Sequence, residues 1–150
     1  MKITIVYDNV VSNPDLAADW GFACLVETEG HTLLFDTGAK GSILLGNMEK
    51  LDIDPAVIDA IFISHNHWDH TGGLDDLLRI HATTVFLPAA CPPPDNAAHI
   101  VSVDRPVELF ENGYSTGQLA GIEQSLVVRQ HDHAVVVAGC SHPGVGTILK

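Results

Sequence analysis

The sequence has few basic residues. Lys and Arg together number 7 against 19 Asp and Glu, which gives a formal charge of −12 over 150 residues. Such a surface repels phosphate backbones and anionic lipids. The composition therefore argues against a nucleic-acid partner and against membrane binding, and we expect a small-molecule substrate.

Cysteine is also scarce, and no apolar run is long. Cys24, Cys91 and Cys140 form no C-x-x-C pair, which excludes a disulfide framework and a zinc knuckle. The first residues indicate a strand rather than a signal peptide, and no stretch is long enough to span a bilayer. We expect a soluble protein of a reducing cytoplasm.

The chain is long enough for a single domain over residues 1–150 with a substantial core, because 46% of its residues are hydrophobic. Apolar periodicity predicts strands at 2–7, 22–28, 32–38, 59–64, 83–88, 99–103, 107–110, 124–130 and 134–140, and helices at 42–51 and 73–80. This order predicts a mixed α/β domain with helices packed against a sheet.

One short segment, "SHNHWDHTGG" at 64–73, concentrates metal-binding side chains. His65 and His67 lie on the same side of an extended segment and can share one ion. Asp69 and His70 follow in a tight turn and can face a second ion. Nitrogen and oxygen donors suit zinc, iron or manganese. A solvated polar loop is the alternative, but four donors in six residues after an apolar strand favour a metal site.

Three motifs, "LLFDTG", "IFISHNHWDHTGGL" and "VVVAGCSHPGV", together resemble the metallo-β-lactamase superfamily. "DWGFACLVET" and "EQSLVV" resemble one branch of it, which contains the dihydropterin ribofuranosyl-aminobenzene phosphate synthases and many hydrolases. The resemblance implies an αβ/βα sandwich with one or two divalent ions per chain, zinc first and iron or manganese next. It assigns His65, His67 and His142 to the first metal, Asp69 and His70 to the second, and Asp36 to orienting an imidazole.

Family members supply a bridging carboxylate and a further histidine after the position of His142, where this sequence has only "PGVGTILK". The resemblance therefore implies a sandwich with an incomplete second half. The chain is then a fragment, a subunit that a partner chain completes, or a reduced form with one good metal. Uncovered sheet edge and apolar surface favour a homo-oligomer or a completing partner chain.

Other side chains are given lesser roles. His131, Asp132 and His133 form a polar hairpin tip, which the following strand holds roughly 20–25 Å from the site. Cys140 ends a buried strand and is expected to be structural. Trp20 and Trp68 are candidates for the mouth of the site, although a tryptophan at such a position more often serves simple packing.

The function that this pattern favours is hydrolysis by a metal-activated water, with Asp69 orienting that water, on a small-molecule ester, lactone or phosphate-containing substrate. Two alternatives stay open. One is a pterin-type synthase on the same scaffold. The other is a metal-binding, oligomeric protein without turnover.

Overall fold

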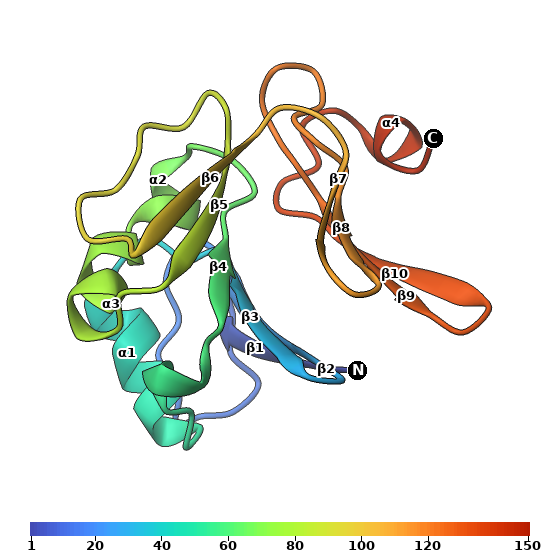
Figure 1. The fold of residues 1–150 in the computed structure, drawn as a ribbon. Coiled ribbons are helices and arrows are strands. Elements are labelled where there is room, and N and C mark those ends of the chain that lie inside the picture. Colours follow the sequence, from blue (N-terminus) through green and yellow to red (C-terminus); the bar gives the residue numbers. More distant parts are fainter.

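The computed structural model describes residues 1–150 as two β-sheets, with helices beside the first sheet and one short helix near the C-terminus (Figure 1). The strands are β1 (Lys2–Tyr7), β2 (Ala23–Thr28), β3 (His31–Phe35), β4 (Ala60–Phe62), β5 (Thr84–Pro88), β6 (His99–Val103), β7 (Val107–Phe110), β8 (Gly113–Ser115), β9 (Leu126–Gln130) and β10 (His133–Val137). The helices are α1 (Gly41–Lys50), α2 (Trp68–Thr71), α3 (Leu74–Ile80) and α4 (Val145–Ile148), with a 3-10 turn at Pro55–Val57. The predicted α/β fold is confirmed.

The first sheet has the order β1-β2-β3-β4-β5-β6. Strands β1 to β3 pair antiparallel, whereas β3 to β6 run parallel to one another. Phe35 pairs with Phe62, so β3 and β4 end side by side. Because parallel strands end at the same edge of a sheet, the segments after Phe35 and Phe62 meet there.

Helices α1 and α3 cover one face of the first sheet (Figure 1). Helix α1 buries Leu44 and Met48, and α3 buries Leu74, Leu77 and Leu78. These side chains pack in one cluster with the sheet residues that face them, among them Val6, Ala23, Leu25, Leu34, Ile61 and Val85. The helical spacing of the apolar residues thus produces the contact with the sheet.

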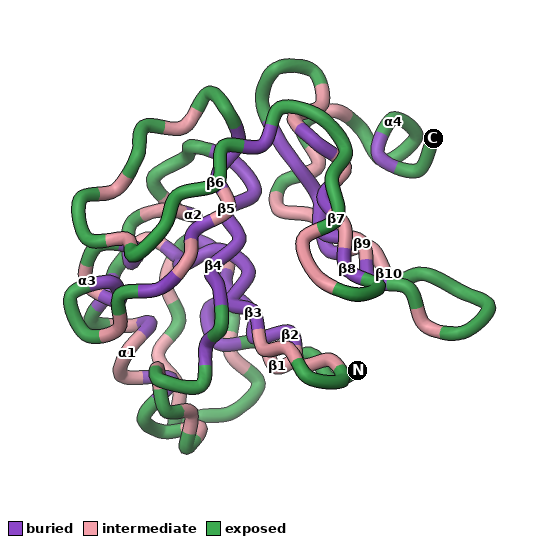
Figure 2. Tube along the Cα trace, viewed as in Figure 1, coloured by how far each residue is buried: buried purple, intermediate pink, exposed green.

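The other face of the first sheet packs against the second sheet, whose order is β10-β9-β8-β7. The inter-sheet core comprises Cys24, Val26, Phe35, Phe62, Leu126, Val128 and Val137. The rings of Phe35 and Phe62 stack at 5.3 Å between centroids. Buried residues run through the central strands, whereas the turn between β9 and β10 is exposed (Figure 2). Because β4 is covered by the helices on one face and by the second sheet on the other, its side chains are apolar on both faces and the strand lies in a continuous apolar run.

The second sheet is smaller than the first and has no long helix on its outer face. Its one associated helix is α4, near the C-terminus (Figure 1). The sandwich is therefore less complete in its second half than in its first. None of the helices has the length and apolar character needed to cross a membrane.

Element boundaries differ from the predictions in several places. Strand β3 ends at Phe35 because Asp36 adopts a left-handed conformation, with φ 56°. The segment expected to be a plain turn after His67 contains the short helix α2, and the turn-rich segment near Tyr114 contains β8. Short elements carry too few residues for periodicity to reveal them.

Candidate metal centre

The candidate site begins where β3 and β4 end. The carboxylate of Asp36 accepts hydrogen bonds from the backbone N–H of Ser64 to Oδ1 and from the Ser64 hydroxyl to Oδ2, both at 2.7 Å. The Ser64 hydroxyl oxygen also lies 2.8 Å from Nδ1 of His65. Asp36, Ser64 and His65 are all fully buried. These contacts fix the ring of His65 and leave its Nε2 free for the site.

Three imidazoles converge at this point. Nε2 of His65 lies 2.9 Å from Nδ1 of His67 and 3.3 Å from Nε2 of His142. His67 follows β4, whereas His142 comes from the turn after β10, so two sheets contribute to one cluster. Ligands of a tetrahedral zinc ion lie about 3.3–3.6 Å apart. The spacing of these nitrogens is close to that of a ligand set.

The electrostatics keep His65 in the metal-binding form. Burial lowers the pKa of His65 to about 3, with a further lowering by the neighbouring imidazoles of His70, His67 and His142. The ring is therefore neutral over the physiological range, with a lone pair on Nε2. Neutral imidazole is the form that binds a metal ion.

A second group of donors lies beside the first. Nδ1 of His70 lies 2.7 Å from Oδ2 of Asp36, so this nitrogen donates to the carboxylate and Nε2 points away from it. That Nε2 is 3.6 Å from Oδ2 of Asp69 and 3.2 Å from Sγ of Cys140. The Asp36–His70 contact is the carboxylate–imidazole pairing that orients metal ligands in proteins.

Asp36 and His70 influence one another's protonation. Burial raises the pKa of Asp36, against the opposing effect of hydrogen bonds from His70 and Ser64. Burial by itself would lower the pKa of His70, but the hydrogen bond and charge of Asp36, with Asp69 and Glu123, raise it overall. Nδ1 of His70 therefore keeps its proton, which it donates to Asp36. Nε2 of His70 faces Asp69.

The donor set fits a divalent metal. Imidazole nitrogens, one carboxylate and one thiol converge, and their ligand atoms fall into two groups within 4.8 Å: His65, Cys140 and His142, and Asp69, His70 and Cys140. Nitrogen, oxygen and sulfur donors in this proportion suit zinc or iron. The structure thus brings together all six residues named from the sequence: Asp36, His65, His67, Asp69, His70 and His142.

The expectation that Cys140 ends a buried strand is wrong. The residue is exposed, not buried in a strand, because β10 ends at Val137 and the chain then turns toward the histidines. Burial of its sulfur and the nearby carboxylates of Asp69, Glu123 and Asp36 raise the pKa of the Cys140 thiol. A cysteine two residues before a ligand histidine was the available sequence signal.

Glu123 was not identified from the sequence. Its fully buried carboxylate accepts hydrogen bonds from the backbone N–H groups of Ser141, at 3.1 Å, and His142, at 2.8 Å. The adjacent Gln124 donates from its backbone N–H to the carbonyl of Ser64 at 2.9 Å. Residues 123–124 therefore tie the two histidine-bearing loops together. Glu123 opens the "EQSLVV" motif, but that motif gave the glutamate no role of its own.

A cavity of about 220 Å³ opens beside the second donor group. Its lining includes Asp69, His70 and Cys140, and Trp20 contributes from the loop before β2. Trp20 therefore lies at the mouth, as expected, whereas Trp68 is exposed and does not line this cavity. A small substrate placed here would contact the donors directly.

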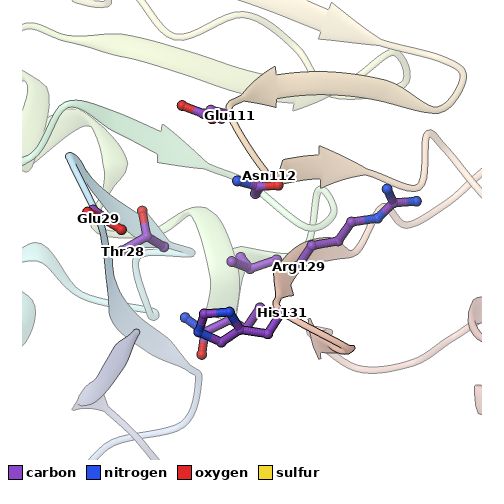
Figure 3. A pocket seen from close by; sticks show the side chains of 8 residues that line it. Thr28, Glu29, Glu111, Asn112, Arg129 and His131 are labelled. Atoms are coloured by element: carbon purple, nitrogen blue, oxygen red, sulfur yellow. The ribbon is translucent and has the colours of Figure 1, made fainter.

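A larger cavity lies elsewhere. About 630 Å³ in volume, it lies between the β2–β3 turn and the second sheet, and its lining includes Glu29, Glu111, Arg129 and His131 (Figure 3). These side chains form no converging donor group. His131 lies in the β9–β10 turn, outside both donor groups, as predicted for the polar hairpin tip. The volume of a cavity thus does not by itself locate the candidate metal site.

Two packed sheets, with helices on the first and histidine loops at the strand ends, define a metallo-β-lactamase-like fold. The family model described as "Metallo-beta-lactamase superfamily" matches residues 21–94, the segment that contains β2 to β5 and the histidine motif. Two solved structures agree with this fold. A quorum-quenching N-acyl homoserine lactone lactonase has a TM-score of 0.60 at 18% identity, over 77% of this chain and 58% of that one. The metallo-β-lactamase MIM-2 has a TM-score of 0.58 at 18% identity, over 78% of this chain and 53% of that one.

Curated relatives include both a synthase and a hydrolase. The chain is 38% identical over 80 residues to the 7,8-dihydropterin-6-methyl-4-(β-D-ribofuranosyl)-aminobenzene-5′-phosphate synthase of Methanocaldococcus jannaschii, covering 51% of this chain and 27% of that protein. It is 36% identical over 76 residues to a hydroxyacylglutathione hydrolase of Methylobacillus flagellatus, covering 51% of this chain and 29% of that protein. The matched segment thus spans less than a third of either relative. The resemblance to the superfamily and to the synthase-like branch is confirmed.

Proposed function

We propose that this protein is a metal-dependent hydrolase of a small-molecule ester, lactone or phosphate-containing compound. The observation that carries the proposal is the convergence of His65, His67 and His142 beside Asp69 and His70. Their donor atoms come from loops of both sheets. Asp69 and His70 line the cavity beside Cys140. Zinc is the preferred ion, with iron as the next choice.

Different residues of the chain would bind the ion, orient the attacking water and position the ligand side chains. A bound divalent ion lowers the pKa of a coordinated water toward about 7 and polarises a substrate oxygen. The Asp69 carboxylate, 13% exposed and lining the cavity, would accept a hydrogen bond from the attacking water and orient it. Asp36 would hold the proton on Nδ1 of His70, which keeps Nε2 toward the site. Trp20 would limit the size of the substrate at the mouth.

The test is a panel assay on protein loaded separately with zinc, iron and manganese. Lactones, thioesters, and phosphate mono- and diesters would be supplied, and turnover would be compared with that of Asp69→Ala. Loss of a group that orients or deprotonates the water costs about 10²- to 10⁴-fold in rate. The matched control is Asp132→Ala, because the Asp132 side chain is 96% exposed in the β9–β10 turn. Full activity in Asp69→Ala, or no turnover of any substrate class, would overturn the proposal.

A synthase is the second candidate, and the 38% identity to the dihydropterin-type synthase is the observation that favours it. The same loaded protein would be incubated with a reduced pterin and a ribofuranosyl-aminobenzene phosphate, and the products separated by mass. A joined product would support the synthase, whereas hydrolysed fragments would support the hydrolase. The two chemistries share a scaffold, so fold similarity does not choose between them.

A further inference from the structure

Cys140 holds a special position between the two donor groups. Its Sγ lies 3.2 Å from Nε2 of His70. It belongs to the group with His65 and His142 and also to the group with Asp69 and His70, and it is the one residue common to both. The sulfur therefore lies where one atom can reach two ions.

The backbone around Cys140 is held in place independently of any metal. Ser141, the next residue, adopts a left-handed conformation with φ 57°, and its N–H donates to Glu123. On the other side, a Cβ on Gly139 would approach the Ser64 hydroxyl to 2.4 Å, so only glycine fits there. Strain and close packing on both sides of one residue indicate that the backbone position of Cys140 is specified.

We propose that the Cys140 thiolate is the ligand shared by two metal positions, one held by His65, His67 and His142 and the other by Asp69 and His70. The inference rests on the proposed metal centre and names an additional ligand within it. On binding, the S–H bond breaks, the proton leaves to solvent, and the sulfur lone pairs form bonds to the ions. A thiolate supplies one negative charge between two dications, which reduces their repulsion.

A sulfur ligand also sets a preference among metals. Thiolate binds zinc and iron well, whereas manganese prefers carboxylate and water oxygens. The proposal therefore predicts that manganese occupies the second position more weakly than zinc does. It further predicts that an oxidant or alkylating reagent directed at Cys140 releases the second ion before the first.

Cobalt(II) loading tests the proposal by spectroscopy. Thiolate ligation gives an intense near-ultraviolet charge-transfer band that histidine and carboxylate ligands do not give. We expect this band in the protein with two cobalt ions, and its loss in Cys140→Ala. Removing an outer partner of a metal ligand costs about 10- to 100-fold in affinity, so loss of a ligand should weaken the second ion at least tenfold. Cys140→Asp should retain two ions without the band.

Cys91→Ala is the matched control, because Cys91 is a partly exposed thiol that packs against the helix-side core and belongs to neither donor group. It should keep both ions and the band. Since Cys140 is exposed, its replacement leaves the core intact, and circular dichroism of each variant checks the fold. Two bound ions without the band, or a band that persists in Cys140→Ala, would overturn the shared-ligand proposal and leave the metal centre standing. No bound cobalt at all would overturn both.

Discussion

At the residue scale, Asp36 links the two parts of the site. One carboxylate accepts from the backbone and hydroxyl of Ser64 and from Nδ1 of His70, while it is fully buried. A buried carboxylate of this kind is tolerated only when its lone pairs are satisfied. Its φ of 56° is one that aspartate and asparagine adopt more readily than other residues.

The change Asp36→Asn tests this role. Asparagine keeps the left-handed backbone but offers one acceptor oxygen where Asp36 uses two, so either Ser64 or His70 loses its partner. Leaving a buried donor unpaired costs about 1–3 kcal/mol in the free energy of unfolding. Metal affinity should fall by about 10- to 100-fold, because the ring of His70 loses its orientation.

Chemical denaturation and metal titration by competition with a chelator would measure both effects. The control is Asp59→Asn, because Asp59 accepts one hydrogen bond, from Thr32 at 2.7 Å, in an exposed position. Equal losses in the two variants would contradict the role given to Asp36.

The lowered pKa of His65 predicts a pH dependence of the metal-free protein. Its pKa is about 3 in the folded chain and 6.5 in the unfolded chain, so between these values the unfolded chain binds a proton that the folded chain does not. The stability contributed at this position is present above pH 6.5 and is lost as the pH falls toward 3.

Urea unfolding at pH 7, 6, 5 and 4 would show this loss as a decreasing free energy of unfolding. His65→Gln should have a shallower pH dependence, whereas His99→Gln, which changes an exposed histidine in β6, should keep the original one. An unchanged dependence in His65→Gln would refute the assignment.

At the element scale, the short helix α2 sets the position of the second donor group. Its residue His70 accepts at its backbone carbonyl from the N–H of Thr37, at 2.8 Å, and from the Thr37 hydroxyl, at 2.9 Å. The loop after β3 and the helix after β4 are thus fastened together. A Cβ on Gly72 would approach the carbonyl oxygen of Ala39 to 2.1 Å, so the two segments meet without room for a side chain.

Gly72→Ala should therefore push α2 away from this loop. We expect a loss of about 1–3 kcal/mol in the free energy of unfolding, the usual cost of overpacking, with weaker binding of the second ion. Gly46→Ala in α1 is the control, because a Cβ there meets nothing within 4 Å. That helical replacement should stabilise the protein by up to about 1 kcal/mol. Thermal melts of both variants decide the matter, and a neutral Gly72→Ala would contradict the tight packing.

The elements show which parts of the fold the sequence determines locally. The long periodic segments, such as α1, α3 and β9, were predicted nearly to their ends. One face of each is buried, and the buried positions carry mainly apolar residues at the helical or strand period. The short α2 and β8 were missed, since three or four residues carry no period. The histidine motif was recognisable because its donors are close in sequence.

Glu123 and Cys140 could not be placed in the same way. Glu123 acts through backbone groups 18 and 19 residues away, and the contact exists only once the second sheet has folded. Cys140 lies 70 residues from the imidazole of His70 that it faces. The partners of such side chains cannot be read from the local sequence, and strand-like surroundings led to the wrong expectation that Cys140 is buried.

At the scale of the whole molecule, the site depends on the packing of two sheets. His65 and His67 belong to the first sheet's loops and His142 to the second sheet, so the imidazole cluster forms only when the inter-sheet core does. Metal binding should consequently stabilise the folded chain, because the unfolded chain lacks the site. Self-association remains a prediction; exposed apolar residues such as Val145 and Leu149 near the C-terminus are consistent with it.

The number of metal ions per chain is the measurement that tests the central claim most directly. Protein purified without chelators would be weighed intact and its zinc, iron and manganese counted by plasma mass spectrometry, before and after refilling. The account predicts two ions per chain, with the second lost first on dilution into chelator. A single ion that no refilling increases would contradict the second position at Asp69 and His70. The absence of any ion after refilling with all three metals would contradict the metal centre itself.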